Sequence, residues 1–197
     1  MTDAECAAAH ADAPALDEQV VPGSDGTLQN VMVWVDKGLD AKYAFKAPSA
    51  PAQIDQNGCT YKPHVITMMA KQSLEVKNSD GVRHNIHATA KTNAEFNFSQ
   101  DPKKTDTLTT ASKAKTFVVG EVPIKVKCDV HGWMGAWVGV FKHPFHGVTG
   151  GDGSVTIKGV PPGTYTLKVW HEKYGTKEVQ VTLKDKGAES VTVEFGE

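Results

Sequence analysis

Three side chains that bind soft metals stand close together near residue 130. Cys128, His131 and Met134 are separated by two residues each, so a thiolate, an imidazole and a thioether lie on one short segment. His84 stands upstream and offers a second imidazole. Two imidazoles, a thiolate and a weakly bound thioether are the ligands of a mononuclear type 1 copper electron-transfer site. The pattern therefore predicts one copper ion, cycling between Cu(I) and Cu(II), on His84, Cys128, His131 and Met134.

Other uses of these residues fit the pattern less well. Structural zinc sites usually take four Cys or His ligands and do not use Met. A c-type haem requires Cys-x-x-Cys-His, and a binuclear copper site needs a second thiolate that residues 129–134 do not offer. The remaining alternative is that Cys128 is a buried structural thiol beside unrelated histidines.

Strand periodicity directs the ligands inward. A strand is predicted over residues 117–127, where Val126 and Cys128 share the apolar face, so the thiol points into the protein. On the strand that carries His84, the same alternation turns His84 toward the core and His87 away from it, unless a bulge reverses the pattern.

Short β-segments extend along most of the chain, and helical periodicity of useful length is absent. We expect strands at 28–35, 65–69, 74–77, 82–86, 117–127, 136–141, 165–170, 179–183 and 191–195. Residues 1–26 are predicted to form an irregular arm with one helical turn at 7–10, and residues 99–115 a long exposed loop. The Ala-Pro-Ser-Ala-Pro segment at 47–51 marks a boundary. The sequence thus predicts an all-β fold.

Composition narrows the range of functions. The chain has 197 residues and a formal net charge of −2, which gives no reason to expect nucleic acid as a partner. No apolar run approaches the roughly 18–20 residues that span a bilayer, and no secretory signal is recognisable. Phosphate-binding loops, paired catalytic carboxylates and nucleophile elbows are absent from the sequence. We therefore expect a protein that is not an enzyme, without a membrane span, and a monomer.

The segment from Leu74 to Asp80, which leads to His84-Asn85, together with Cys-x-x-His-x-x-Met, resembles the cupredoxins, and the ligand spacing is similar to that of amicyanin. The resemblance covers about residues 60–141. It implies a Greek-key β-sandwich with copper at one pole, held by the four ligands named above. It also implies that Asn85 forms hydrogen bonds that tie the two ligand loops together.

The tail resembles a second family. Residues 148–167, with the Gly163-x-Tyr165 turn, look like the carboxypeptidase regulatory-like (transthyretin-like) sandwich, which implies a structural module without catalytic residues. Residues 142–197 are short for that module. We expect residues 27–46 to complete it, with a cupredoxin domain at 47–141 inserted between the two pieces. The alternative is that the strand at 28–35 is the first strand of the cupredoxin.

The combined chain is similar to exported bacterial proteins described as methylamine-utilisation-like, which carry a segment like residues 58–64. With Cys128 on copper, this resemblance implies a disulfide between Cys6 and Cys59, hence an oxidising compartment and a periplasmic or otherwise exported protein. The alternatives are two free thiols, or Cys6 as a lipid-anchor cysteine.

Two other histidines, His64 and His87, are candidates for additional copper ligands. The function predicted is single-electron transfer between redox proteins of the cell envelope. The first alternative is a copper-binding or copper-buffering protein that uses the same ligands without electron transfer. The second is a structural binding module with a vestigial site.

Overall fold

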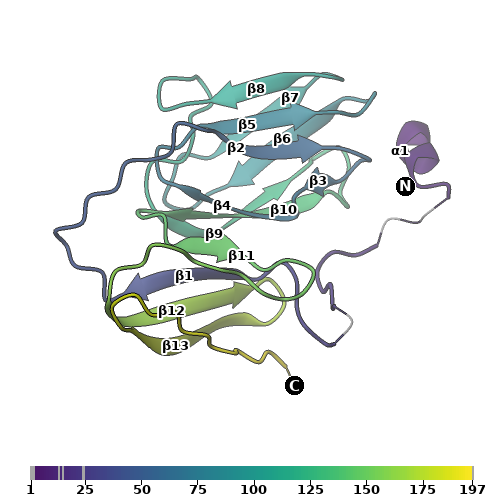
Figure 1. The fold of residues 1–197 in the computed structure, drawn as a ribbon. Coiled ribbons are helices and arrows are strands. Elements are labelled where there is room, and N and C mark those ends of the chain that lie inside the picture. The colour runs from purple at the N-terminus through teal and green to yellow at the C-terminus, as the bar shows by residue number, and fades with distance from the viewer. Residues whose placement is uncertain (1–2, 13, 15, 24, 197) are drawn as a thin grey trace. The chain divides into compact units, whose positions relative to one another are not determined.

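The computed structural model describes residues 3–12, 14, 16–23 and 25–196. The chain forms two compact units, each built from two separate pieces of sequence. Unit 1 consists of Met1–Asp17 and Ala47–Lys142, and unit 2 of Glu18–Lys46 and His143–Glu197. Figure 1 labels the elements of both units.

Unit 1 contains two sheets. The larger has the order β4-β10-β9-β6-β7, formed by Val65–Met69, Gly135–Phe141, Glu121–Lys127, His84–Thr89 and Phe96–Gln100. The smaller has the order β3-β2-β5-β8, formed by Tyr61–Lys62, Ala52–Gln56, Leu74–Asn78 and Thr105–Leu108. The pairs β4–β10 and β2–β5 are parallel and the other pairs are antiparallel.

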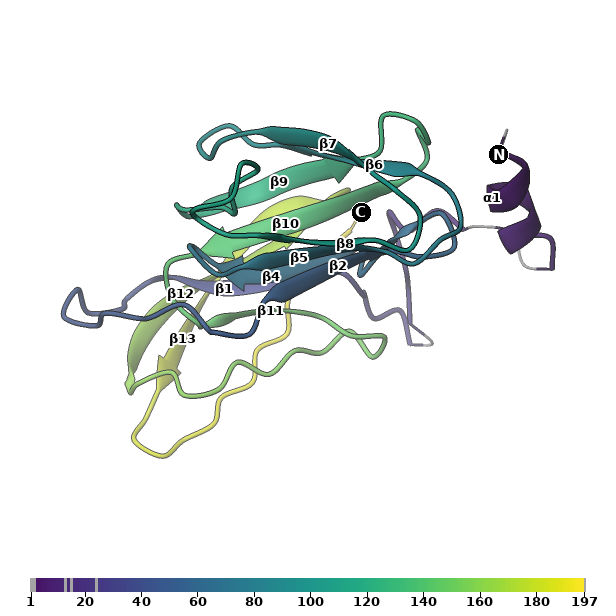
Figure 2. The ribbon, with the colours of Figure 1, turned by 90° about the horizontal axis from the view of Figure 1, so that it is seen from above.

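The two sheets of unit 1 pack face to face, as the view in Figure 2 shows for β6 and β9 against β2 and β5. Their shared core takes Ile54 and Val76 from the smaller sheet and Ile86, Ile124 and Val138 from the larger, all almost inaccessible to solvent. Successive side chains of a strand point to opposite faces, so apolar residues at every second position give each sheet one apolar face. The two apolar faces pack against each other. The predicted all-β fold class is confirmed.

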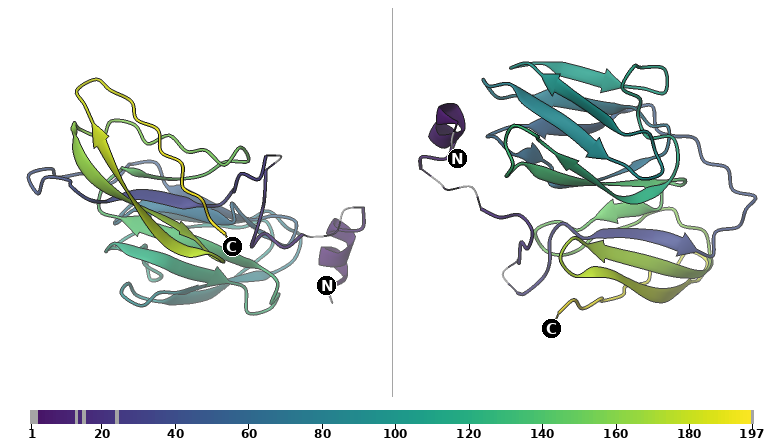
Figure 3. Two further views of the ribbon diagram at one scale, coloured as in Figure 1. Left: turned by 90° about the horizontal axis from the view of Figure 1, so that it is seen from below. Right: turned by 180° about the vertical axis from the view of Figure 1, so that it is seen from behind.

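Unit 2 has one four-stranded antiparallel sheet among its described residues, with the order β11-β1-β12-β13. Its strands are β11 (His146–Val148), β1 (Met32–Lys37), β12 (Gly163–His171) and β13 (Gly175–Leu183). In Figure 3, the purple β1 lies beside strands from the far end of the chain, and Met32 is paired with both Val148 and Trp170. One face is covered by a cluster around Val35, Phe145 and Tyr165.

Three expectations about unit 1 need correction. The segment predicted as an exposed loop over 99–115 contains β8, which pairs with β5 as an edge strand and therefore lacks a full apolar face. The strand predicted from 117 starts only at Glu121, since the amides of Val118 and Val119 bond to the Asn93 side chain instead of a neighbouring strand. The helical turn predicted at 7–10 in the N-terminal arm is a longer helix that starts earlier, α1 (Ala4–Ala9).

In unit 2, the strand predicted at 191–195 does not form. The residues alternate as a strand would, but the Phe195 ring stacks on Tyr174 in the β12–β13 turn and lies tilted against His171 at the end of β12. No backbone ladder joins the segment to the sheet. In the described part of unit 2, no second sheet packs on the four-stranded sheet. Ile157 and Val160, which lie on irregular segments, pack against the apolar cluster of the sheet instead.

Asp3 is the N-cap of helix α1. Its carboxylate accepts hydrogen bonds from the amides of Glu5 (3.0 Å) and Cys6 (3.1 Å). Cys6 is fully buried in the core of unit 1. None of the helices in the described part of the chain has the length and apolar character needed to cross a membrane.

Candidate metal centre

A tight loop connects β9 to β10 and carries Cys128, His131 and Met134. Two backbone hydrogen bonds close it: the Cys128 amide donates to the Met134 carbonyl (3.2 Å) and the Met134 amide to the His131 carbonyl (2.9 Å). The side chains of all three residues are buried. The loop is thus folded back on itself, with its sulfur and nitrogen donors on the inner side.

The pairing of β6 with β9 brings His84 to this loop. His87 lies opposite Lys127 and Ala88 opposite Val126, so β6 starts beside the point where β9 ends. His84 is the first residue of β6 and is completely buried. Residues 84 and 128 therefore meet through an antiparallel ladder.

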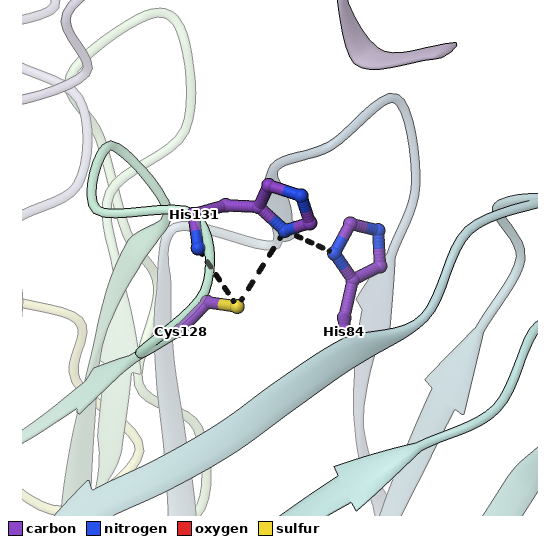
Figure 4. A group of neighbouring side chains, drawn as sticks. All are labelled: His84, Cys128 and His131. Carbon is purple, nitrogen blue, oxygen red and sulfur yellow. Dashed lines mark hydrogen bonds between the residues drawn. The ribbon is translucent and has the colours of Figure 1, made fainter. Parts of the chain in front are cut away.

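Three donors converge on one point (Figure 4). His84 Nδ1 lies 2.9 Å from His131 Nδ1, and His131 Nδ1 lies 3.7 Å from Cys128 Sγ. One ligand atom from each of the three residues falls within 4.8 Å of the other two. Donors about 2.0–2.3 Å from one first-row transition-metal ion lie roughly 3–4 Å from one another, so the arrangement fits a single ion.

The surroundings of Cys128 favour its thiolate form. The amides of Asn85 and His131 both donate to Cys128 Sγ, each at 3.4 Å. Burial pushes the pKa of Cys128 upward, but hydrogen bonds from His84 and from the backbone amides outweigh it and leave the pKa below its ordinary value. A thiolate is the form of cysteine that binds metals.

His84 is oriented by a carboxylate. His84 Nε2 lies 2.8 Å from Asp80 Oδ2, and Asp80 also accepts hydrogen bonds from the amides of Gly58 (2.7 Å) and Cys59 (2.9 Å). With Nε2 engaged in this way, Nδ1 faces the other donors, which is how outer hydrogen bonds fix a metal-binding histidine. Sequence reasoning missed Asp80. Its position four residues before His84, in the turn after β5, was the available signal.

The two imidazoles titrate differently. Burial acts to lower the pKa of His84, but hydrogen bonds to Asp80 and Cys128 outweigh it and raise the pKa to about 9. Burial, followed by the charge of His84, lowers the pKa of His131. Of the two neighbouring imidazoles, His84 therefore holds a proton more strongly than His131 does.

Asn85 connects the two ligand segments. Its Oδ1 accepts a hydrogen bond from the Asp129 amide (2.7 Å), its Nδ2 donates to Asn97 Oδ1, and its backbone amide reaches Cys128 Sγ. The Tyr61 hydroxyl donates to the Asn85 carbonyl (2.5 Å). The start of β6 and the start of the ligand loop are therefore held in one hydrogen-bonded unit.

The other predicted site residues have these positions. Met134 is buried at the end of the loop and stays the predicted axial ligand. His64 Nδ1 lies 3.1 Å from the Gly135 carbonyl oxygen. His87 points outward between Asp129 (3.0 Å) and Glu95 (2.7 Å). Neither of these histidines belongs to the group formed by His84, Cys128 and His131.

The Cys6–Cys59 disulfide is confirmed, with an S–S distance of 2.08 Å, and Cys128 is a free, buried cysteine. The structure adds that the bridge lies against the candidate metal centre. Cys6 Sγ and a carboxylate oxygen of Asp3 group with a nitrogen of His131 within 4.8 Å, and Cys59 Sγ groups in the same way with Asp80 and His84. Spacing along the chain gave no sign of this proximity.

A comparison with models of protein families gives no match, and a comparison with curated proteins gives none either. Solved structures do match. A copper-containing nitrite reductase from Thermus scotoductus matches 53% of this chain at 15% identity and a TM-score of 0.41, and the match spans only 25% of the reductase.

Two smaller proteins match over nearly their whole lengths. A purple cupredoxin from Nitrosopumilus maritimus is 20% identical over 45% of this chain and 98% of its own, with a TM-score of 0.36. An amicyanin variant in the Cu(I) state is 16% identical over 53% of this chain and 99% of its own, with a TM-score of 0.38. Over about half of its length, the chain is thus similar to proteins whose names refer to copper or to cupredoxins.

Proposed function

We propose that unit 1 is a cupredoxin-like domain that binds one copper ion and transfers single electrons between redox proteins outside the cytoplasm. The observation that carries the proposal is the convergence of a hydrogen-bonded thiolate and two imidazole nitrogens in one buried group, Cys128, His84 and His131. Met134, buried on the same loop, is proposed as the weak fourth ligand.

Copper supplies a one-electron change between Cu(I) and Cu(II) when it is bound. The protein contributes a donor set that suits both oxidation states, since thiolate and imidazole bind each of them. The hydrogen bonds that Asp80 accepts from His84 and that Asn85 Oδ1 accepts from the Asp129 amide keep the donors in place. A site whose ligands need not move between oxidation states transfers electrons at low reorganisation cost.

The location and the partners are part of the proposal. A buried disulfide between Cys6 and Cys59 is typical of an oxidising compartment, which supports an exported protein. Unit 2 is proposed as a structural transthyretin-like module, and the whole chain as a carrier that has no enzymatic activity of its own.

Titration of the metal-free protein with Cu(II) tests this function. We expect an intense visible thiolate-to-copper absorption band and an EPR spectrum of one type 1 centre at one copper per chain. Cys128→Ser is the control and should lose the band. A wild-type protein that binds no copper, or binds it without the band, would contradict the proposal. Sluggish or irreversible voltammetry of the loaded protein would favour copper buffering instead.

A further inference from the structure

The His131 imidazole is shielded from solvent although it lies on a surface loop. Only 4% of His131 is exposed. A carboxylate oxygen of Asp3 and the sulfur of Cys6 lie within 4.8 Å of a His131 nitrogen, and both residues belong to α1 and its cap. A redox partner therefore cannot touch this imidazole while α1 is in place.

Two contacts hold α1 over His131. The disulfide joins Cys6 in the helix to Cys59. Just after the helix, His10 Nε2 lies 2.5 Å from the Gly58 carbonyl oxygen. The helix is thus fastened to the same 58–59 segment at two points, so the cover is covalently tethered as well as packed.

Trp133 provides a different connection between the ligand loop and the surface. The centroids of its ring and of the His131 ring are 5.1 Å apart, with the ring planes at 49°. Its Nε1 donates to the Cys59 carbonyl (3.1 Å), which fixes the indole beside the tether. Trp133 is 39% exposed, so one side of the indole reaches solvent while its ring contacts a ligand.

We infer that Trp133 is the residue through which electrons enter and leave the metal centre, in place of the covered edge of His131. The inference rests on the proposed function. In the outward step the copper is oxidised from Cu(I) to Cu(II), and a one-electron acceptor in contact with the indole is reduced, with no proton transferred and no bond formed or broken. Electron transfer weakens steeply with distance, and the indole is the exposed ring in contact with His131.

Oxidation of the copper-loaded protein by ferricyanide, followed by stopped flow, tests the role of Trp133. Trp133→Leu should lower the second-order rate constant by at least roughly tenfold, which corresponds to about 1.4 kcal/mol in activation free energy. Trp133→Phe keeps a ring beside His131 and should retain most of the rate. Val130→Ala, at a 64% exposed position of the same loop, is the matched control and should leave the rate unchanged.

Two further readouts separate an electron route from a structural role. The reduction potential and the visible band of Trp133→Leu should match those of the wild type, since Trp133 is not a ligand. An unchanged rate in Trp133→Leu, or a rate loss accompanied by a shifted potential and band, would overturn the inference. A wild-type protein without the band would instead refute the proposed function.

The cover is tested in the metal-free protein. Diethyl pyrocarbonate should leave His131 unmodified in the native protein and modify it in the urea-unfolded chain, as read by peptide mass spectrometry. Modification of native His131 at the unfolded rate would contradict the shielding by α1. In a Cys6→Ser, Cys59→Ser variant that stays folded, His131 should become reactive and the ferricyanide rate should depend less on Trp133, whereas full retention of shielding would contradict the tether.

Discussion

At the scale of single residues, the properties of the proposed copper centre depend on side chains that are not ligands. Asp80 holds His84 through Nε2 and is itself held by two amides of the segment next to the disulfide. Asn85 joins β6 to the ligand loop. Such outer hydrogen bonds orient the metal-binding atoms before the metal binds. Their loss lowers the affinity for the metal and the stability of the protein.

Replacement of Asp80 by Asn should weaken copper binding. An amide of the same shape cannot accept from His84 and from two backbone amides at once, so His84 loses its fixed orientation. We expect the affinity to fall by about 10–100-fold, measured by competition with a chelator of known affinity. Asp101→Asn, at the exposed ion pair with Arg83, is the matched control. Equal affinities for Asp80→Asn and Asp101→Asn would show that the carboxylate has no such role.

Replacement of Asn85 by Ala should destabilise unit 1. The Asp129 amide would lose its buried acceptor. We expect the free energy of unfolding, measured in urea, to fall by about 1–3 kcal/mol. Thr89→Ala, which removes a more exposed hydrogen bond from the same strand to the Lys125 carbonyl, should cost less than about 1 kcal/mol. The prediction is wrong if the two substitutions have the same effect.

At the scale of elements, the start of β9 is fixed by a carboxylate clamp. The Glu121 side chain accepts hydrogen bonds from the amides of Lys91 (2.5 Å), Thr92 (3.1 Å) and Asn93 (2.8 Å). Asn93 in turn bonds to the segment before β9. The strand that ends at Cys128 is thus anchored at its other end by contacts to the β6–β7 connection.

This clamp should make stability depend on pH. Burial pushes the pKa of Glu121 upward, but the amides of Lys91, Thr92 and Asn93 outweigh it and hold the pKa below the usual 4.5. A folded-state pKa below the unfolded value gives a stabilisation that is present above about pH 4.5 and is lost as the pH falls through the folded pKa.

Glu121→Gln tests the clamp. It should lower the free energy of unfolding by about 1–2 kcal/mol at pH 7, and the difference from wild type should shrink below about pH 4, as measured by urea unfolding at several pH values. Glu75→Gln, on the polar face of β5, should change the free energy by less than about 0.5 kcal/mol. A difference that stays constant from pH 7 to pH 3 would contradict the assignment to the carboxylate.

At the scale of the whole molecule, the two units interrupt each other in sequence. Unit 2 is assembled from Glu18–Lys46 and His143–Glu197, and β1 from the first piece lies between β11 and β12 from the second. The residues of the candidate metal centre all belong to unit 1. The stability of unit 2 should therefore be separable from the chemistry of the site.

Val35→Ala tests this separation. Val35 is buried in the unit 2 cluster, and its truncation should destabilise that unit by about 2 kcal/mol. We expect one calorimetric transition to move down while the visible copper band and the other transition stay unchanged. Val138→Ala in the core of unit 1 should have the reciprocal effect, and copper should raise only the unit 1 transition. Transitions that shift together in both variants would contradict independent units.

The sequence alone determined the features that depend on local order. Residue types and a spacing of two residues marked Cys128, His131 and Met134, and strand alternation turned Cys128 and His84 inward. Many of the strands with strong apolar alternation were also predicted. The edge strands β3, β7, β8 and β11 were not, because an edge strand buries little, and β2 was missed as well. Residues 191–195 alternate without pairing.

Only the tertiary structure decided what depends on long-range contact. The β6–β9 ladder sets how close His84 comes to Cys128. Asp80 is close to His84 in sequence, but it is held by the amides of Gly58 and Cys59 from a distant segment. The position of α1 beside His131 likewise depends on segments that are far apart in sequence. The physical reason is that alternation fixes the face of a strand on which a side chain lies. The residue that this side chain contacts on another strand or helix is set by the packing of the whole unit.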